Sequence, residues 1–169
     1  KEGDTSTSGP NGLSEIAPID IDGDGVVDYV YAGDLKGNLW RFDLMSDNPN
    51  NWEISLGSAA NPSPIYVAWD EQTTRVRQPI TAAPDAILHP NGGVLVTFGT
   101  GSYVFKNDDQ STQAQTVYGI WDKLDGNAVS STDRSNLQQQ QVITATVQAT
   151  STYTFGGTAT TETSTYRTL

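Results

Sequence analysis

The chain is 169 residues long, with 36% hydrophobic residues and 16 glycines, a composition that can bury a core but lacks the helix-forming bias typical of bundles. Its 20 acidic and 9 basic residues give a net charge of -11, which repels phosphate backbones and anionic lipids, argues against nucleic acid as a partner and favours cations. Because the chain has no cysteine, disulfides and thiolate metal sites are excluded, and a bound metal would need oxygen ligands.

Membrane-spanning and targeting segments are not expected within these residues. No apolar stretch approaches the roughly 20 residues of a membrane span. The first residues, KEGDTSTSGPNG, lack the apolar core of a signal peptide. Any membrane association is therefore expected to be indirect, and secretion stays compatible with a chain cut from something longer.

The first distinctive element is an acidic motif, D-x-D-x-D-G-x-x-D, at residues 20–28. Calcium takes about six to eight oxygens, and alternate side chains of a curling loop can converge on one ion. Gly25 permits the sharp turn that other residues resist. The motif therefore predicts a calcium site. Its expected ligands are the carboxylates of three alternate aspartates, one backbone carbonyl and a closing carboxylate: Asp20, Asp22, Asp24, the carbonyl of Val26, and Asp28.

Three alternatives to this calcium site fit the motif less well. An EF-hand loop of about 12 residues closes with a glutamate, whereas Tyr31 stands at that position. Magnesium demands near-octahedral geometry and keeps its water. A solvated acidic turn leaves the alternate spacing and the glycine unexplained, and its carboxylates would repel each other by about 1 kcal/mol per close pair in water.

A β-hairpin is predicted directly after the motif. Residues 26–32 are apolar or aromatic apart from Asp28, which predicts a strand buried on both faces with Asp28 inside it. A polar, glycine-bracketed loop follows at residues 33–38, and residues 39–44 then alternate. The alternation predicts one hydrophobic face opposite a polar one. The hydrophobic face consists of Trp40, Phe42 and Leu44, and the polar face of Arg41 and Asp43.

A similar pattern recurs later in the chain, where residues 93–101 and 117–122 again form two candidate strands, now separated by a longer polar loop. Such a weak repeat suggests two blades of a β-propeller, whose units are four-stranded sheets of roughly 40–50 residues. The calcium-bearing blade would span residues 11–57 and the second blade residues 79–125, with residues 79–84 as its extended lead. The alternative is two unrelated hairpins in a β-sandwich.

The remaining residues, 126–169, carry a weaker signal. Thr132 or Asp133 could cap a short helix over residues 134–141. The Thr- and Ser-rich stretches beyond it are typical either of strands joined by Gly turns or of a mobile flank. The two candidate strands are residues 142–150 and 152–168.

The stretch NGLSEI…DIDGDGVVDYVYAGDLKGNLWRFDL closely resembles the C-terminal domain of the PilY/PilC family of type IV pilus biogenesis factors and tip-associated adhesins. The stretch PITAAPDAI…VLVTFGTGSYV…TVYGIWDK continues the resemblance, and the final YRTL is also similar. Together these stretches cover most of residues 11–122. The most specific part is YAGDLKGNLWRFDL.

The resemblance implies part of a modified seven-bladed, quinoprotein-like β-propeller with calcium bound in the loop at residues 20–28. It implies an exported protein at the bacterial cell surface, outer membrane or pilus tip, with the pilus machinery or pilins and the host-cell surface as partners. In that family, calcium occupancy is associated with pilus extension and retraction, surface adhesion and twitching motility. At roughly 40–50 residues per blade, residues 1–169 are expected to form an incomplete propeller of about three blades or fewer.

Two rival functions remain open. An integrin-like FG-GAP adhesion propeller uses the same kind of loop but predicts it in each blade, whereas residues 97–100 have no D-x-D-x-D before them. A remnant of a quinoprotein dehydrogenase propeller would need polar groups and a metal on the propeller axis. His89 is the single histidine and lies in HPNGG, a turn by composition, so no catalysis is expected.

The tryptophans could form an adhesive aromatic surface, but blade cores also consume aromatic side chains. Core packing is therefore the expected role of Trp40, Trp52, Trp69 and Trp121.

Overall fold

The computed structural model describes residues 11–70, 75–106, 108–129, 134, 137–140, 145–155 and 158–168, the last two ranges by their backbone alone. The chain divides into two compact units, Lys1–Asn136 and Leu137–Leu169. In the described ranges the regular structure is β-strand apart from two short 3₁₀ turns, η1 (Pro49–Asn51) and η2 (Asp108–Gln110), which confirms the predicted all-β class. No helix among these residues is long and apolar enough to cross a membrane.

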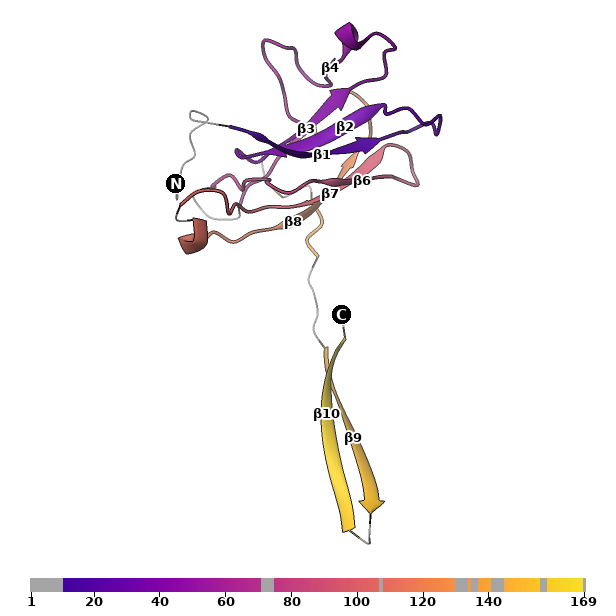
Figure 1. Cartoon of the computed structure of the whole chain (residues 1–169), viewed down its shortest axis with the longest axis vertical. Coiled ribbons are helices and arrows are strands. Elements are labelled where there is room, and N and C mark those ends of the chain that lie inside the picture. Colours follow the sequence, from indigo (N-terminus) through magenta and orange to yellow (C-terminus); the bar gives the residue numbers. More distant parts are fainter. Residues whose placement is uncertain are drawn as a thin grey trace. The chain divides into compact units, whose positions relative to one another are not determined.

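The first unit contains two antiparallel sheets (Figure 1). The first sheet has the order β1-β2-β3-β4, and β5 also pairs with β3. Its strands are β1 (Leu13–Ile19), β2 (Tyr29–Asp34), β3 (Asn38–Asp43), β4 (Glu53–Ile54) and β5 (Tyr66–Val67). The second sheet has the order β6-β7-β8. Its strands are β6 (Asp85–Leu88), β7 (Val94–Gly99) and β8 (Val117–Asp122).

The predicted hairpin is present, but its first strand begins later than the apolar run suggested. β2 starts at Tyr29, and Asp28 lies directly before it. Val26 and Val27 belong to the preceding loop, where their side chains are 62% and 36% exposed. The apolar character of these valines therefore does not mark strand burial, because the loop turns them towards solvent.

The predicted hydrophobic face of β3 is not the more buried one. Trp40 and Phe42 are half-buried, whereas Leu39 is 0% and Arg41 is 5% exposed. The register pairs Arg41 with Tyr31 of β2, and side chains of such cross-strand pairs lie on the same face. This face contacts the second sheet, where Asp122 pairs with Arg41. A charged residue can therefore occupy a core position because its partner is buried with it.

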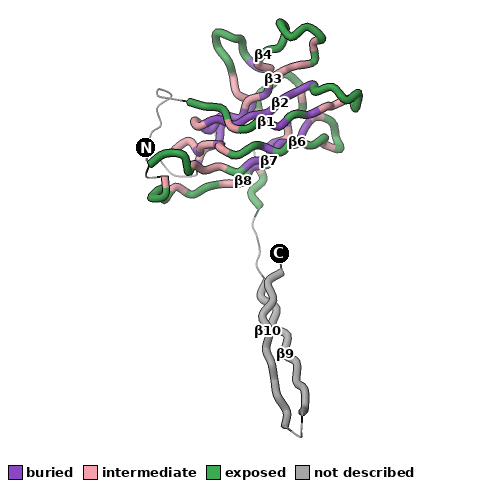
Figure 2. Tube along the Cα trace, in the orientation of Figure 1, coloured by how far each residue is buried: buried purple, intermediate pink, exposed green. Residues whose placement is uncertain are grey.

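Most of the core is formed by β2, β3, β7 and β8. Figure 2 shows buried residues running through β2 and β3 while the loops around them are exposed. Aromatic contacts extend the core, with ring centroids of Tyr66 and Tyr118 5.4 Å apart and those of Phe98 and Tyr118 5.2 Å apart. The largest fully buried apolar side chains at its centre are Tyr31, Tyr66, Leu39, Ile65, Ile80, Ile120, Val94 and Val96.

The tryptophans do not fill this core, contrary to the prediction. Trp52 is 48% exposed, and the other three are half-buried. Trp121 Nε1 donates to the carbonyl of the exposed Gly92 (2.8 Å), whereas Trp40 Nε1 donates to Oδ2 of the fully buried Asp34 (2.8 Å). The aromatic side chains of the core instead include Tyr31, Tyr66, Tyr118 and Phe98.

The segment predicted to lead into the second blade ties the two sheets together. The Ile80 amide donates to the Asp34 carbonyl (2.9 Å), and the Gly101 amide donates to the Pro79 carbonyl (2.8 Å). Ile80 approaches Gly33 so closely that a Cβ on Gly33 would lie 2.2 Å from the Ile80 Cγ2 atom. A glycine is therefore needed at this point of β2.

The predicted helix over residues 134–141 is wrong for the part of it that the structure describes, because Arg134 and residues 137–140 are not helical. Both proposed caps, Thr132 and Asp133, lie outside the described residues. Arg134 instead donates through Nε (2.9 Å) and Nη2 (2.6 Å) to the Trp69 carbonyl. Its guanidinium lies 5.3 Å from the Tyr118 ring centroid, so tertiary contacts override the local helix signal.

The second unit contains an antiparallel hairpin of β9 (Ala145–Phe155) and β10 (Thr158–Thr168). Its register runs without a break from the pair Thr158 and Phe155 to the pair Thr168 and Ala145. The Thr-rich stretches therefore form strands, the first of the two alternatives, but the predicted limits are wrong: residues 152–155, assigned to the second strand, belong to β9, and β10 begins only at Thr158.

Candidate metal centre

The acidic loop, residues 20–28, connects β1 to β2 and is closed at its base by backbone hydrogen bonds. Ile19 and Tyr29 are cross-strand partners. The Asp28 amide donates to the Ile19 carbonyl (3.0 Å), and the Leu44 amide donates to the Asp28 carbonyl (2.8 Å). The loop therefore starts and ends on paired strands, which holds its first and last aspartates near each other.

Two glycines allow the chain to curl inside this loop. Gly23 has φ +81° and Gly25 has φ +89°, in the left-handed region, and a Cβ added at either position would meet nothing within 4 Å. Backbone conformation, not lack of space, is therefore what favours glycine here. This agrees with the turn that the motif predicts at Gly25 and adds a second one at Gly23.

Carboxylate oxygens from three aspartates converge in the loop. Ligand atoms of Asp20, Asp22 and Asp28 all lie within 4.8 Å of one another. Oxygens on opposite sides of one calcium ion are up to about 5 Å apart, since each lies about 2.3–2.6 Å from the metal. The three carboxylates therefore fit a single calcium ion.

Backbone amides orient these carboxylates. Asp20 accepts from the Gly25 amide through Oδ2 and from the Gly23 amide through Oδ1, both at 2.7 Å. These two hydrogen bonds, that of Gly25 first, hold the pKa of Asp20 below its ordinary value. Asp28, which is 8% exposed, accepts from the Ile21 amide through Oδ2 (2.7 Å). The loop thus fixes both side chains and favours the ionised form of Asp20 that a metal requires.

Asp24, the fourth aspartate among the predicted ligands, lies in the loop but not in this cluster. Asp24 Oδ1 accepts from the Val26 amide (2.7 Å), and the Asp24 amide donates to Asp22 Oδ1 (3.1 Å). The Asp24 carboxylate is not among the three that converge. Coordination by Asp24 and by the Val26 carbonyl therefore stays a prediction.

The structure also contains a buried polar cluster that the sequence analysis did not predict. Asp122 of β8 accepts from Arg41 Nη1 at 2.8 Å through Oδ1 and at 2.6 Å through Oδ2, and from the Tyr31 hydroxyl at 3.0 Å. Burial, followed by the charge of Asp122, raises the pKa of Tyr31. The sequence does contain a signal for this cluster. Arg41 in WRFD and Asp122 in IWDK carry opposite charges and lie in the matching strands of the two repeats.

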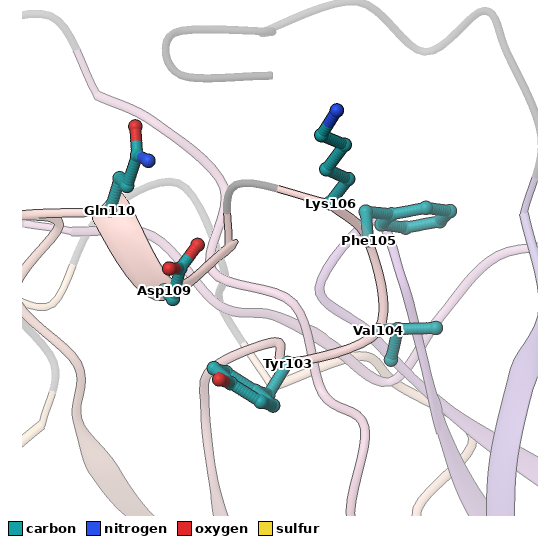
Figure 3. Close-up of a pocket in the computed structure, with 6 residues that line it drawn as sticks. All are labelled: Tyr103, Val104, Phe105, Lys106, Asp109 and Gln110. Carbon is teal, nitrogen blue, oxygen red and sulfur yellow. The ribbon is translucent and has the colours of Figure 1, made fainter.

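A hollow lies at the loop between β7 and β8, with a volume of about 500 Å³. Its six lining residues are Tyr103, Val104, Phe105, Lys106, Asp109 and Gln110. Figure 3 shows their side chains spreading outward in different directions. Since no set of polar groups converges among these residues, the hollow is a weaker candidate for a metal site than the acidic loop.

The predicted turn at His89 is confirmed. The His89 amide donates to the Gly93 carbonyl and the Gly92 amide donates to the His89 carbonyl, both at 2.9 Å. The imidazole stacks on Trp121, with ring centroids 4.3 Å apart. These contacts give His89 a place in the packing of the second sheet.

Comparisons with known proteins give consistent matches. A sequence profile of the PilY1 beta-propeller domain matches residues 2–158. The type IV pilus biogenesis factor PilY1 of Pseudomonas aeruginosa strain PAO1 is 44% identical over 171 aligned residues, which cover 87% of this chain and 14% of that protein. A PilY1 homolog from Xylella fastidiosa strain Temecula1 is 43% identical over 120 residues, covering 70% of this chain and 8% of that protein.

A solved structure resembles the chain as well. The crystal structure of the Pseudomonas aeruginosa PilY1 C-terminal domain superposes with a TM-score of 0.69 and 40% sequence identity. The match covers 94% of this chain and 35% of the solved chain. The chain therefore spans about a third of that domain and a much smaller share of the curated relatives.

Proposed function

Because the chain belongs to the PilY1 beta-propeller family, we propose that it is a calcium-binding part of a type IV pilus biogenesis factor. The observation that carries the calcium assignment is the convergence of Asp20, Asp22 and Asp28 within 4.8 Å in one loop. The acidic character of the chain, with a net charge of -11, supports a cationic ligand.

Calcium would supply the positive charge that lets three carboxylates stay close together without repulsion. Asp20 and Asp28 stand at the two ends of the loop, next to Ile19 and Tyr29, which are cross-strand partners. An ion held by both would therefore fasten the end of β1 to the start of β2. Binding to the folded form alone stabilises a protein by about 2.7 kcal/mol when free calcium is 100 times Kd.

The wider role is proposed from the relatives. PilY1 proteins are named as type IV pilus biogenesis factors. We expect this chain to act at the cell surface with the pilus machinery or pilins, and calcium occupancy to influence pilus extension and retraction, surface adhesion and twitching motility. No catalytic role is proposed for it.

Isothermal titration calorimetry with calcium chloride tests the site. The wild-type protein is expected to bind one ion, with Kd on the order of 10⁻⁴ to 10⁻³ M as in extracellular calcium modules. Asp22→Asn is a suitable variant because Asp22 is exposed, so the loss of its negative charge should leave the fold intact. It should weaken binding by about 10-fold or more, since one ligand charge is lost.

Two further variants complete this titration. Asp47→Asn is the matched control, because Asp47 is also exposed but lies outside the loop, and it should bind like wild type. Asp24→Ala tests whether Asp24 is a ligand. Equal affinities for wild type and Asp22→Asn would refute the site.

A further inference from the structure

Alternate side chains after the acidic loop lie on the face of β2 that meets the second sheet. Tyr29 and Tyr31 lie on the same face of β2 because side chains alternate along a strand. Their partners in β3 are Asp43 and Arg41, respectively. The face that begins one residue after Asp28 therefore carries Arg41 at its centre.

Arg41 joins this face to β8. Its guanidinium carbon lies 5.1 Å from the centroid of the Tyr29 ring. Its Nη1 donates to both oxygens of Asp122, at 2.8 and 2.6 Å. Arg41 is 5% and Asp122 1% exposed. A pair this buried is strong only while its geometry is kept, because neither charge has water as an alternative partner.

The acidic loop shares backbone with this junction. The Asp28 carbonyl accepts from the amide of Leu44, the residue directly after β3. The Asp28 carboxylate, in turn, accepts from the Ile21 amide within the loop. Asp28 therefore connects the loop to β3, the strand that carries Arg41, and to Tyr29, on whose ring Arg41 rests.

We infer that the acidic loop and the junction between the two sheets are coupled through Tyr29 and Arg41, so that calcium strengthens the Arg41–Asp122 contact and that contact raises calcium affinity. Coupling between two sites is reciprocal, so each effect implies the other. This inference rests on the proposed calcium site. It gives calcium a second role, as a regulator of how firmly one blade holds its neighbour.

Calcium titration of paired tyrosine variants tests the coupling. Tyr31→Phe removes the hydroxyl that donates to Asp122 and keeps the ring. Tyr118→Phe is its control, because it removes a tyrosine hydroxyl from the second sheet that donates to the Trp69 carbonyl and to Gln78 Oε1, both at 2.8 Å, and not to Asp122. Tyr31→Phe should weaken calcium binding by about 3-fold and Arg41→Gln by about 10-fold. Tyr118→Phe should lower the melting temperature and leave calcium affinity unchanged.

Amide hydrogen exchange gives a second readout of the junction. The Leu124 amide donates to Asp122 Oδ1 at 3.0 Å, so its exchange reports on Asp122. Calcium should slow the exchange of the Leu124 amide in wild type and slow it less in Tyr31→Phe. Because this comparison does not need Arg41→Gln, the coupling can be tested even if that variant does not fold.

The outcomes separate the two proposals. Wild-type affinity in Tyr31→Phe, together with no effect of calcium on Leu124 exchange, would refute the coupling while leaving the site intact. An equal loss of affinity in Tyr118→Phe would also refute it, by showing a general effect of destabilisation. A wild-type protein that binds no calcium would refute the site itself.

Discussion

The connection between the first two strands differs sharply between the two sheets. In the first sheet, the acidic loop at residues 20–28 joins β1 to β2, and three of its carboxylates converge. In the second sheet, the turn at residues 89–93 joins β6 to β7 and closes on itself through two backbone hydrogen bonds. The strands repeat between the two sheets, but the acidic loop has no counterpart in the second sheet. The function that we propose resides in this loop.

The loop between β7 and β8 also contains aspartates, but it uses them differently from the acidic loop. Asp108 Oδ2 accepts from the Ser102 hydroxyl (2.6 Å) and from the amides of Val104 (2.8 Å) and Phe105 (2.9 Å). The Phe105 amide, followed by the Ser102 hydroxyl, lowers the pKa of Asp108. A single carboxylate thus organises this loop, whereas a metal centre needs several that converge.

The largest effect is expected where the two sheets meet. Asp122→Ala should leave the Arg41 guanidinium buried without its charged partner, and breaking such a pair costs about 3–5 kcal/mol. Equilibrium unfolding in urea should show this loss. Lys123→Ala is the control, because Lys123 is exposed and lies over the Trp121 ring, and it should cost about 1 kcal/mol at most. Similar midpoints for both variants would contradict the burial of the pair.

A smaller effect is expected from the acidic loop's own backbone. Gly25→Ala should strain the loop by about 1–2 kcal/mol because alanine disfavours a positive φ, although space for the methyl group is available. Calcium affinity should fall by about 5- to 30-fold if all of this strain opposes binding. Gly12→Ala is the control, since its new Cβ would meet only the Leu35 Cδ1 atom at 3.8 Å. A wild-type affinity in Gly25→Ala would show that the loop does not need this conformation.

The smallest effect concerns pH in the metal-free protein. The folded state lowers the pKa of Asp20, so its stabilising contribution is present above the ordinary value of about 3.9 and is lost as pH falls through the lowered pKa. Melting curves of wild type and Asp20→Asn should differ at pH 6 and converge at acidic pH. A difference that grows as pH falls would contradict the assigned direction.

The repeat and the resemblance were predictable from local sequence, and the family assignment confirms the resemblance. Alternation and glycine spacing located the hairpin of β2 and β3, and the motif located the carboxylates that converge. These features depend on neighbours along the chain, so a single sequence contains them.

Other features depend on tertiary contacts and were not predictable in the same way. From the sequence alone Arg41 is predicted on the polar face of its strand, because its ion-pair partner, Asp122, lies in the other sheet. Arg134 lies in a helical pattern but is held by the Trp69 carbonyl and the Tyr118 ring. Tryptophans were expected in the core because blade cores take up aromatic side chains, yet Trp52 is 48% exposed and the Trp121 indole donates to the carbonyl of the exposed Gly92.

The most direct test of the central claim is a crystal structure of the protein grown with calcium chloride, with the ion identified by its anomalous scattering. One calcium is expected between Asp20, Asp22 and Asp28, with carboxylate oxygens about 2.3–2.6 Å from it, and its remaining ligands would show whether Asp24 and the Val26 carbonyl take part. A saturating calcium concentration that leaves no ion in this loop would contradict the account.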